Sequence, residues 1–293
     1  MYDIKNIYQP KSVGEALKMK NEHPEALLLA GGSDILIQIR DGKLAGSDLI
    51  SIHSLEELRG ISLEDDGTIL IKPLTSFSHV TQNPLIQKFI PALGDAVDQI
   101  GGPQIRNIGT IGGNICNGVT SADSASTLKA YDAILEISSV DGIRVLPYAD
   151  FSKGPGKVDL KPNEILTGIR ILKDSYENTY GKYIKYSIRR AMDIATLGCS
   201  VNVRLSDDKK TIERLRIGYG VAGPTPMRVP TAESLATGKL ISEQLIIDVA
   251  TATLIDVNPR TSWRATKEFR MQLVKELCKR ALKAAINQAG GTI

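Results

Sequence analysis

The sequence predicts an α+β protein divided into two or three domains. Its 293 residues are too many for one compact core of usual size. The first 52 residues have the pattern of a strand–helix–strand unit, whereas later segments pair short strands across tight turns and the chain ends in helices. This mixture is typical of the α+β class.

The N-terminal segment is expected to place a ligand-binding turn at the end of a strand. Residues 9–23 predict a helix, with Ser12 as its N-cap and Glu15 as the capping-box partner. Residues 26–30 predict an apolar strand buried on both faces, and residues 48–52 predict its neighbour. Asp34 is placed to cap the short helix between them. Ligands bind at the carboxyl ends of strands in open α/β sheets.

The middle of the chain is predicted to hold two hairpins and several helices. The hairpins are expected at residues 58–72, around Asp65-Asp66-Gly67, and at residues 133–146, around Asp141-Gly142. Helices are expected after Ser76, over 84–100 and over 124–131. Residues 104–114 are interpreted as a glycine-rich loop, residues 152–163 as a lid or connector, and residues 164–171 as a strand.

The last third is predicted to be a separate domain, because residues 173–181 are polar and rich in turn formers. A strand at 182–187 and a hairpin at 199–219 precede helices at 231–236, 242–255 and 266–289. Apolar residues recur every four positions along the last helix and predict its buried stripe: Phe269, Leu273, Leu277, Ala281 and Ala285. Trp263 is interpreted as a core anchor.

Two glycine pairs stand directly after apolar runs. One is Gly31-Gly32, followed by Ser33 and Asp34, and the other is Gly112-Gly113, preceded by Thr110. Glycine lets the backbone turn with φ > 0 and lets a ligand approach the N–H groups closely. Each pair alone is typical of an ordinary turn. Together they favour a site in which both segments hold one diphosphate.

Composition and missing motifs exclude several classes of function. A net charge of +3 is too weak to indicate nucleic-acid binding, and no apolar run is long enough for a membrane span. The three scattered cysteines and the isolated histidines offer no metal site, which favours a cytoplasmic protein with reduced thiols. The sequence has no P-loop or Gly-x-Ser-x-Gly motif, and its Gly-x-Gly-x-x-Gly string at residues 218–223 runs into the rigid turn Ala222-Gly223-Pro224-Thr225-Pro226 and does not open a helix, as a dinucleotide-binding motif would. We therefore expect no catalytic side-chain set and a cofactor that carries the chemistry.

The motifs resemble those of the FAD-binding subunits of molybdenum hydroxylases, with bacterial xanthine dehydrogenase as the most similar subfamily. The resemblance rests on the segments Leu28–Asp34 and Gln104–Asn114, on Ser121-Ala122-Asp123, and on Arg260-Thr261-Ser262-Trp263-Arg264. Glu164-Ile165-Leu166, Lys185 and Arg189-Arg190 extend it over essentially the whole chain.

The resemblance implies a PCMH, or vanillyl-alcohol-oxidase type, FAD module followed by a C-terminal α+β domain. The FAD module would span residues 1–175, as α/β subdomains of about 1–55 and 56–175, and the second domain would span 176–293. It further implies that the two glycine segments wrap the FAD diphosphate and that Asp123 holds a cofactor hydroxyl. Lys185 would lie near the pyrimidine end of the flavin. The implied cofactor-binding residues are Leu27, Leu28, Leu29, Ala30, Gly31, Gly32, Ser33, Asp34, Ile100, Gly109, Thr110, Gly112, Gly113, Asn114, Asn117, Asp123, Ile165, Leu166 and Lys185.

The sequence departs from the family pattern at two places. Some relatives have an aromatic residue over the flavin where this chain has Ile100, which offers no π face. Many read Ser-Pro-x-Ser-Asp where this chain has Val119-Thr120-Ser121-Ala122-Asp123. The carboxylate is retained, but the local turn is expected to differ.

The implied function is electron transfer in purine metabolism. Electrons would leave a substrate at a molybdenum-cofactor subunit, pass through 2Fe–2S clusters on another subunit, reach FAD on this chain and leave as a hydride to NAD. Two alternatives are a stand-alone flavin oxidoreductase and a non-catalytic scaffold that keeps the FAD fold. The sequence determines neither the partner's substrate nor the electron acceptor, because a substrate pocket would lie on another chain.

Overall fold

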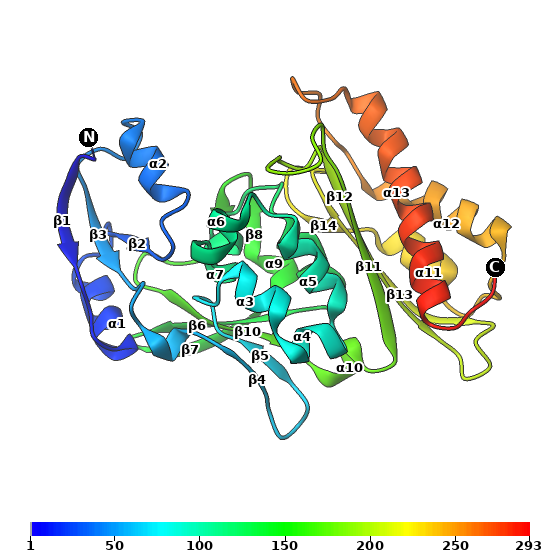
Figure 1. Cartoon of the computed structure of the whole chain (residues 1–293), viewed down its shortest axis with the longest axis horizontal. Helices are drawn as coiled ribbons and strands as arrows, with labels where there is room; N and C mark the ends of the chain where they lie inside the picture. The colour runs from blue at the N-terminus through cyan, green and yellow to red at the C-terminus, as the bar shows by residue number, and fades with distance from the viewer. Residues whose placement is uncertain (1) are drawn as a thin grey trace.

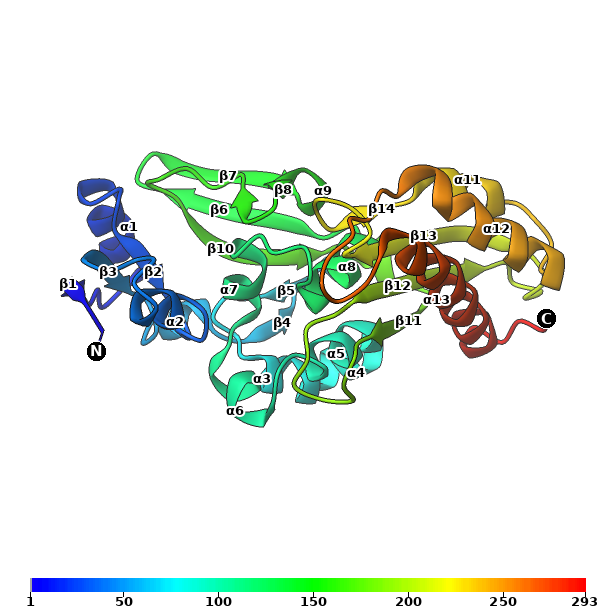
Figure 2. The ribbon, with the colours of Figure 1, turned by 90° about the horizontal axis from the view of Figure 1, so that it is seen from above.

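The computed structural model describes residues 2–293 and places three units in a row (Figures 1 and 2). The first is a three-stranded parallel sheet in the order β1-β3-β2. Its elements are β1 (Ile4–Tyr8), α1 (Val13–Glu22), β2 (Leu27–Leu29), α2 (Ile35–Arg40) and β3 (Ser47–Ser51). The predicted cap of α1 is confirmed, because the Ser12 hydroxyl accepts from the Glu15 N–H, although the Glu15 carboxylate reaches the N–H of Lys11.

One strand of this first unit was not predicted, and two expectations for the unit are wrong. Strand β1 was not predicted, because its central residues are exposed and it lacks an apolar alternation. Strand β2 is only half-buried, not buried on both faces, because it lies at the edge of the sheet. Asp34 occupies the N-cap position of α2 but makes no capping bond and instead accepts from the Gln38 amide at 2.5 Å.

The second unit is a five-stranded sheet in the order β4-β5-β10-β6-β7, in which all neighbouring strands are antiparallel. Both predicted hairpins are present. The strands are β4 (Ile61–Leu63), β5 (Ile69–Ile71), β6 (Ile134–Ser139), β7 (Gly142–Pro147) and β10 (Ile165–Ile171). The segment expected as a lid or connector contains a small two-stranded sheet, β8 (Ser152–Gly154) with β9 (Lys157–Val158).

Helices cover one face of this sheet, as Figure 1 shows. They are α3 (Phe77–Gln82), α4 (Pro84–Phe89), α5 (Pro91–Asp98), α6 (Pro103–Ile108), α7 (Ile111–Cys116) and α8 (Asp123–Ala130). Shorter helical pieces are η1 (Glu56–Leu58), α9 (Tyr148–Phe151) and α10 (Lys173–Tyr176). The expected glycine-rich loop at 104–114 is therefore largely helical, because Pro103 and Thr110 each begin a helical turn.

The third unit is an antiparallel sheet in the order β11-β12-β13-β14 with three helices packed on it. Helix α8 of the second unit contacts β12 and β13, and α5 contacts β11, so the sheet is covered from both sides (Figure 2). The elements are β11 (Thr179–Tyr186), β12 (Leu197–Leu205), β13 (Ile212–Gly220), β14 (Met227–Arg228), α11 (Pro230–Ala236), α12 (Glu243–Asp256) and α13 (Lys267–Gln288). Ser242 and Thr266 cap α12 and α13.

Two aromatic residues of this unit were placed wrongly by the sequence pattern. Leu273, Leu277, Ala281 and Ala285 are buried as predicted, but Phe269 is 39% exposed and Trp263 is 79% exposed. Trp263 precedes α13, and Phe269 lies in the first turn of α13, where it contacts Tyr186 of the edge strand β11 and stays partly exposed. Spacing along the helix therefore does not decide the environment of either residue. Within residues 2–293 the cysteines are unpaired, and no helix is long and apolar enough to cross a bilayer.

Candidate cofactor site

The two glycine segments lie against each other. A methyl group on Gly31 would stand 1.9 Å from the carbonyl oxygen of Ile108, and one on Gly113 would stand 3.9 Å from the Ala30 side chain. Only a residue without a side chain fits at Gly31. Segments about eighty residues apart in the sequence therefore share one site, which is the geometry that a two-sided grip requires.

The first segment presents free backbone donors. Gly32 has φ +72°, and the N–H groups of Gly31, Gly32, Ser33 and Asp34 donate to no acceptor among the described residues. The segment follows the carboxyl end of β2. Consecutive free N–H groups in such a turn form a concavity that suits an anion. Leu27, Leu28 and Leu29 form the strand that carries it, and Ala30 packs with Leu28 and Ile165 in the core of the first unit.

The second segment differs from the expected amide concavity. Thr110 is the N-cap of α7, and its hydroxyl accepts from the Gly113 N–H at 3.1 Å. The N–H groups of Ile111, Gly112 and Asn114 donate to Thr75, Pro73 and Thr110 carbonyls. Because these donors are already used, the segment contributes shape and side chains and few backbone donors.

The glycines of the second segment serve close packing. A methyl group on Gly112 would lie 2.4 Å from the Pro73 ring, and one on Gly109 would lie 2.7 Å from Phe77. Neither residue has a positive φ. The glycines thus bring α7 against the neighbouring backbone, and Gly113 at the start of α7 faces Ala30 of the first segment.

A buried charged cluster joins the second and third units. Lys185 Nζ lies 2.8 Å from Asp123 Oδ2, and the Tyr183 hydroxyl donates to Asp123 Oδ1 at 2.5 Å. The side chains of Asp123 and Lys185 are 6% and 5% exposed. Burial raises the pKa of Asp123, although Lys185 and Tyr183 both act in the opposite direction. Burial and the adjacent carboxylate raise the pKa of Tyr183 well above its ordinary value.

This cluster is connected to the glycine segments through α7 and α8. The Ser124 hydroxyl donates to Asn114 Oδ1 at 2.7 Å, and Lys185 Nζ also donates to the Gln99 carbonyl at 2.9 Å. Ile100 follows Gln99 and is partly buried against the core of the second unit. The predicted residues from three separate stretches of sequence therefore form one continuous region.

Ile165 and Leu166 lie at the start of β10, where both side chains are buried. They pair with Ser138 and Ile137 of β6, and the register shifts between Leu166 and Gly168. The hydrogen-bonded pairing of β10 with β6 is therefore interrupted next to Leu166. Ion pairing of Glu164 with Arg144, at 2.7 Å, fixes the beginning of the strand.

Tyr183 was missed by sequence reasoning, although a signal for it exists. Residues 183 and 185 point to the same face of β11, because side chains alternate along a strand. Once Lys185 is assigned to a site, a tyrosine two residues earlier becomes a candidate partner.

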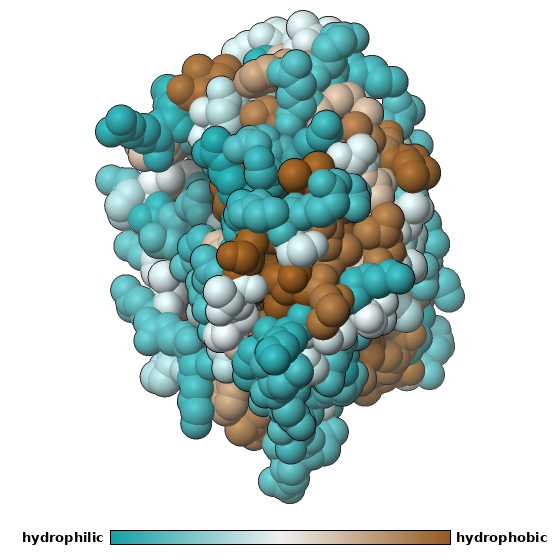
Figure 3. All heavy atoms as spheres, turned by 90° about the vertical axis from the view of Figure 1, so that its right-hand side faces the viewer, coloured by the Kyte–Doolittle hydropathy of each residue, from teal (hydrophilic) through white to brown (hydrophobic). Residues whose placement is uncertain are grey.

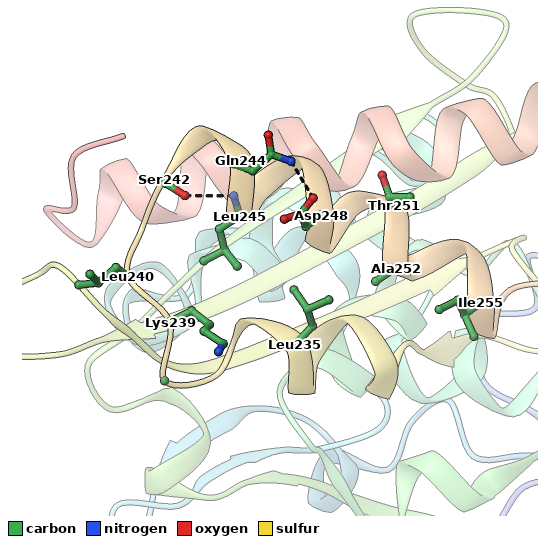
Figure 4. A pocket seen from close by; sticks show the side chains of 11 residues that line it. Leu235, Lys239, Leu240, Ser242, Gln244, Leu245, Asp248, Thr251, Ala252 and Ile255 are labelled. Atoms are coloured by element: carbon green, nitrogen blue, oxygen red, sulfur yellow. Dashed lines mark hydrogen bonds between the residues drawn. The ribbon is translucent and has the colours of Figure 1, made fainter.

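A surface groove lies elsewhere, on the third unit. It runs between α11 and α12 and contains none of the predicted cofactor residues (Figure 4). Leu235, Leu240 and Ile255 line it and are exposed. Figure 3 shows apolar surface on this end of the molecule. The groove is therefore separate from the region around Gly31 and Asp123.

Comparison with known proteins finds two family models along the chain. The model described as the FAD binding domain in molybdopterin dehydrogenase matches residues 2–171, and that of the CO dehydrogenase flavoprotein C-terminal domain matches residues 182–285. The chain is 41% identical over the full length of both proteins to the putative xanthine dehydrogenase FAD-binding subunit XdhB of Escherichia coli K12. It is 30% identical to the glyceraldehyde dehydrogenase medium chain of Sulfolobus acidocaldarius, over 93% of this chain and 95% of the relative.

Solved structures agree with these matches. The carbon monoxide dehydrogenase of Hydrogenophaga pseudoflava superimposes with a TM-score of 0.91 at 30% identity, over 97% of this chain and 98% of that one. The match covers the helices and sheets of all three units.

Proposed function

Because the chain belongs to the family of FAD-binding subunits of molybdopterin dehydrogenases, we propose that it transfers electrons from partner iron–sulfur clusters through FAD to NAD. The chain is a subunit of an oxidoreductase with an FAD-binding domain. The supporting observation is the Gly31–Ile108 contact, which joins free backbone donors to the α7 segment in one site.

The residues present fit the proposed cofactor. The free N–H groups of residues 31–34 are suitable donors for a diphosphate. Gly31 lets this turn lie directly against Ile108, where any side chain would collide with the Ile108 carbonyl. When bound, FAD supplies the redox chemistry, and the protein positions it and sets its electrostatic surroundings. The Lys185 ammonium is held between Asp123 and the Gln99 carbonyl, so its positive charge has a fixed place. We retain the nineteen predicted cofactor residues as part of this proposal.

The proposal includes partners and a location. Relatives are named as medium chains or FAD-binding subunits, which supports a hetero-oligomer with a molybdenum-cofactor subunit and a 2Fe–2S subunit. The identity with a xanthine dehydrogenase subunit supports a purine as the partner's substrate. Three unpaired thiols support a cytoplasmic location. We also propose that the FAD module ends near residue 175.

The test is to purify the complex through a tag on this chain and to mix it anaerobically with NADH. We expect about one FAD per chain and loss of the oxidised flavin absorption on mixing. A chain that stays colourless with added FAD would refute the cofactor site. Flavin that a purine reduces but NADH does not would refute NAD as the acceptor.

A further inference from the structure

A tight turn before α13 holds an exposed tryptophan in a fixed place. The Ser262 N–H donates to the Ala265 carbonyl at 2.9 Å, and the Ser262 hydroxyl accepts from the Arg264 N–H. Trp263 and Arg264 form the tip, with the guanidinium 4.2 Å from the centre of the indole ring. In Figure 1 the loop that leads into α13 projects from the upper end of the molecule. We call residues 262–265 the tryptophan turn.

The base of this turn is anchored to the body of the protein. The Lys267 N–H donates to Thr261 Oγ1 at 3.0 Å, and the Lys267 ammonium donates to Asn258. Phe269 meets the ring of Tyr186 edge-on at 5.6 Å. Since Tyr186 follows Lys185 in β11, the turn lies near the same end of this strand as the proposed cofactor residue, on the opposite face of the sheet.

Three arginines surround the turn without a countercharge. Arg260, Arg264 and Arg270 make no ion pair with any residue from 2 to 293. Arg270 is 2% exposed and donates to Ser262 Oγ at 2.8 Å, while its Nε and that of Arg264 are buried without a partner. Burial and the two neighbouring guanidinium groups lower the pKa of Arg270. A buried cation without an anion is costly unless something supplies one.

The composition and shape of this surface favour a protein occupant. Tryptophan and arginine are the residues that dominate binding energy in protein interfaces. An indole that is 79% exposed leaves its apolar area in water in the isolated chain. Small-molecule sites are concave, whereas the tryptophan turn projects outward. The uncompensated positive charge requires that the occupant be acidic.

We propose that the tryptophan turn, together with Arg260, forms the docking surface for an acidic segment of a partner subunit. Trp263 enters an apolar recess of the partner, and partner carboxylates pair with Arg260 and Arg264, which are accessible, while the buried Arg270 adds positive charge beneath them. The inference rests on the proposed function, because it requires the subunits of a molybdenum hydroxylase.

The experiment uses the intact complex, purified through a tag on this chain and washed at increasing ionic strength. Iron and molybdenum per flavin measure how much of each partner remains. We expect Trp263→Ala and Arg264→Glu to lower both metals at least tenfold at moderate salt, and Arg264→Lys to have a much smaller effect. Flavin per chain should stay unchanged in all variants. Leu240→Ala and Ile255→Ala are matched controls, because those side chains are 69% and 72% exposed on the α11–α12 groove.

The outcomes separate this inference from the proposed function. Full retention of iron and molybdenum by Trp263→Ala and Arg264→Glu would overturn the docking surface alone. Retained metals with a raised KM for NADH would also overturn it and would assign the surface to a dinucleotide. A wild-type chain that retains FAD but never carries iron or molybdenum would overturn the proposed function, and the inference with it.

Discussion

At the scale of single residues, the close approach of the two glycine segments depends on the missing Cβ of Gly31 more than on their overall glycine content. Sequence reasoning treated both glycine pairs as flexible turns with free amides. The structure assigns the free donors to residues 31–34 and gives Gly109 and Gly112 a packing role. Among the glycines of residues 2–293, Gly31 alone has a backbone carbonyl oxygen within 2 Å of where a side chain would begin.

Gly31→Ala should therefore separate the two segments. The new methyl group must move Ile108 or the strand end, at a cost of about 1–3 kcal/mol in the free energy of unfolding. We expect the flavin-to-protein ratio of the purified variant to fall severalfold and urea unfolding to shift to lower concentration. Gly154→Ala is the control, because nothing lies within 4 Å of its added methyl group. Normal flavin content in Gly31→Ala would contradict the shared site.

At the scale of elements, an ion pair at Glu164 holds the beginning of β10 in place. Arg144 of β7 binds Glu164 through two nitrogens, at 2.7 and 2.8 Å, and Glu164 also accepts from the Lys161 N–H. Burial alone would raise the pKa of Glu164, but these bonds offset it and hold the pKa below the ordinary value. The strand therefore enters the sheet next to Ile165 and Leu166 in a fixed register.

Glu164→Gln should change the pH dependence of stability. A carboxyl whose folded pKa is depressed stabilises the protein above its ordinary pKa, which is 4.5, and loses this contribution as the pH falls below it. We expect the variant to lose about 2 kcal/mol at pH 7 and little at pH 3. Urea unfolding between pH 3 and pH 7 measures this. Glu276→Gln, which breaks an exposed ion pair on α13, should lower stability by well under about 1 kcal/mol at either pH. Parallel pH profiles of wild type and Glu164→Gln would disprove the assignment.

At the scale of the whole molecule, opposite charges meet between the second and third units. The carboxylates come from residues before 175, and the cations come from residues after it. The ion pairs are Asp95 with Lys182, Asp123 with Lys185, Asp132 with Arg216 and Arg228, and Asp174 with Arg204 and Arg214. Electrostatic attraction thus adds to the packing of α5 and α8 on the third sheet.

Asp132→Asn should weaken this junction without straining the backbone. Asp132 has φ +50°, a conformation that asparagine tolerates. Because its partners are partly exposed, we expect a loss of about 1 kcal/mol at low salt. The difference in melting temperature from wild type should shrink in 1 M NaCl, since ions screen the pair. Asp141→Asn, in an exposed hairpin turn, is the control. A difference that is independent of salt would contradict the electrostatic account.

The sequence by itself determined the features that depend on neighbouring residues. The caps at Ser12 and Ser242, the hairpins around Asp66 and Asp141, and the family resemblance were all predictable. These features follow from backbone sterics, short hydrogen bonds and local apolar periodicity, which act over a few residues.

Only the tertiary structure decided which side chains meet across long distances in the sequence. It paired Asp123 with Tyr183 and Lys185, placed Gly31 against Ile108, and left Trp263 exposed where the pattern predicted a core residue. The physical reason is that burial and charge compensation depend on which surfaces pack together. A periodic pattern shows that a residue is apolar or charged, but the fold determines what it contacts.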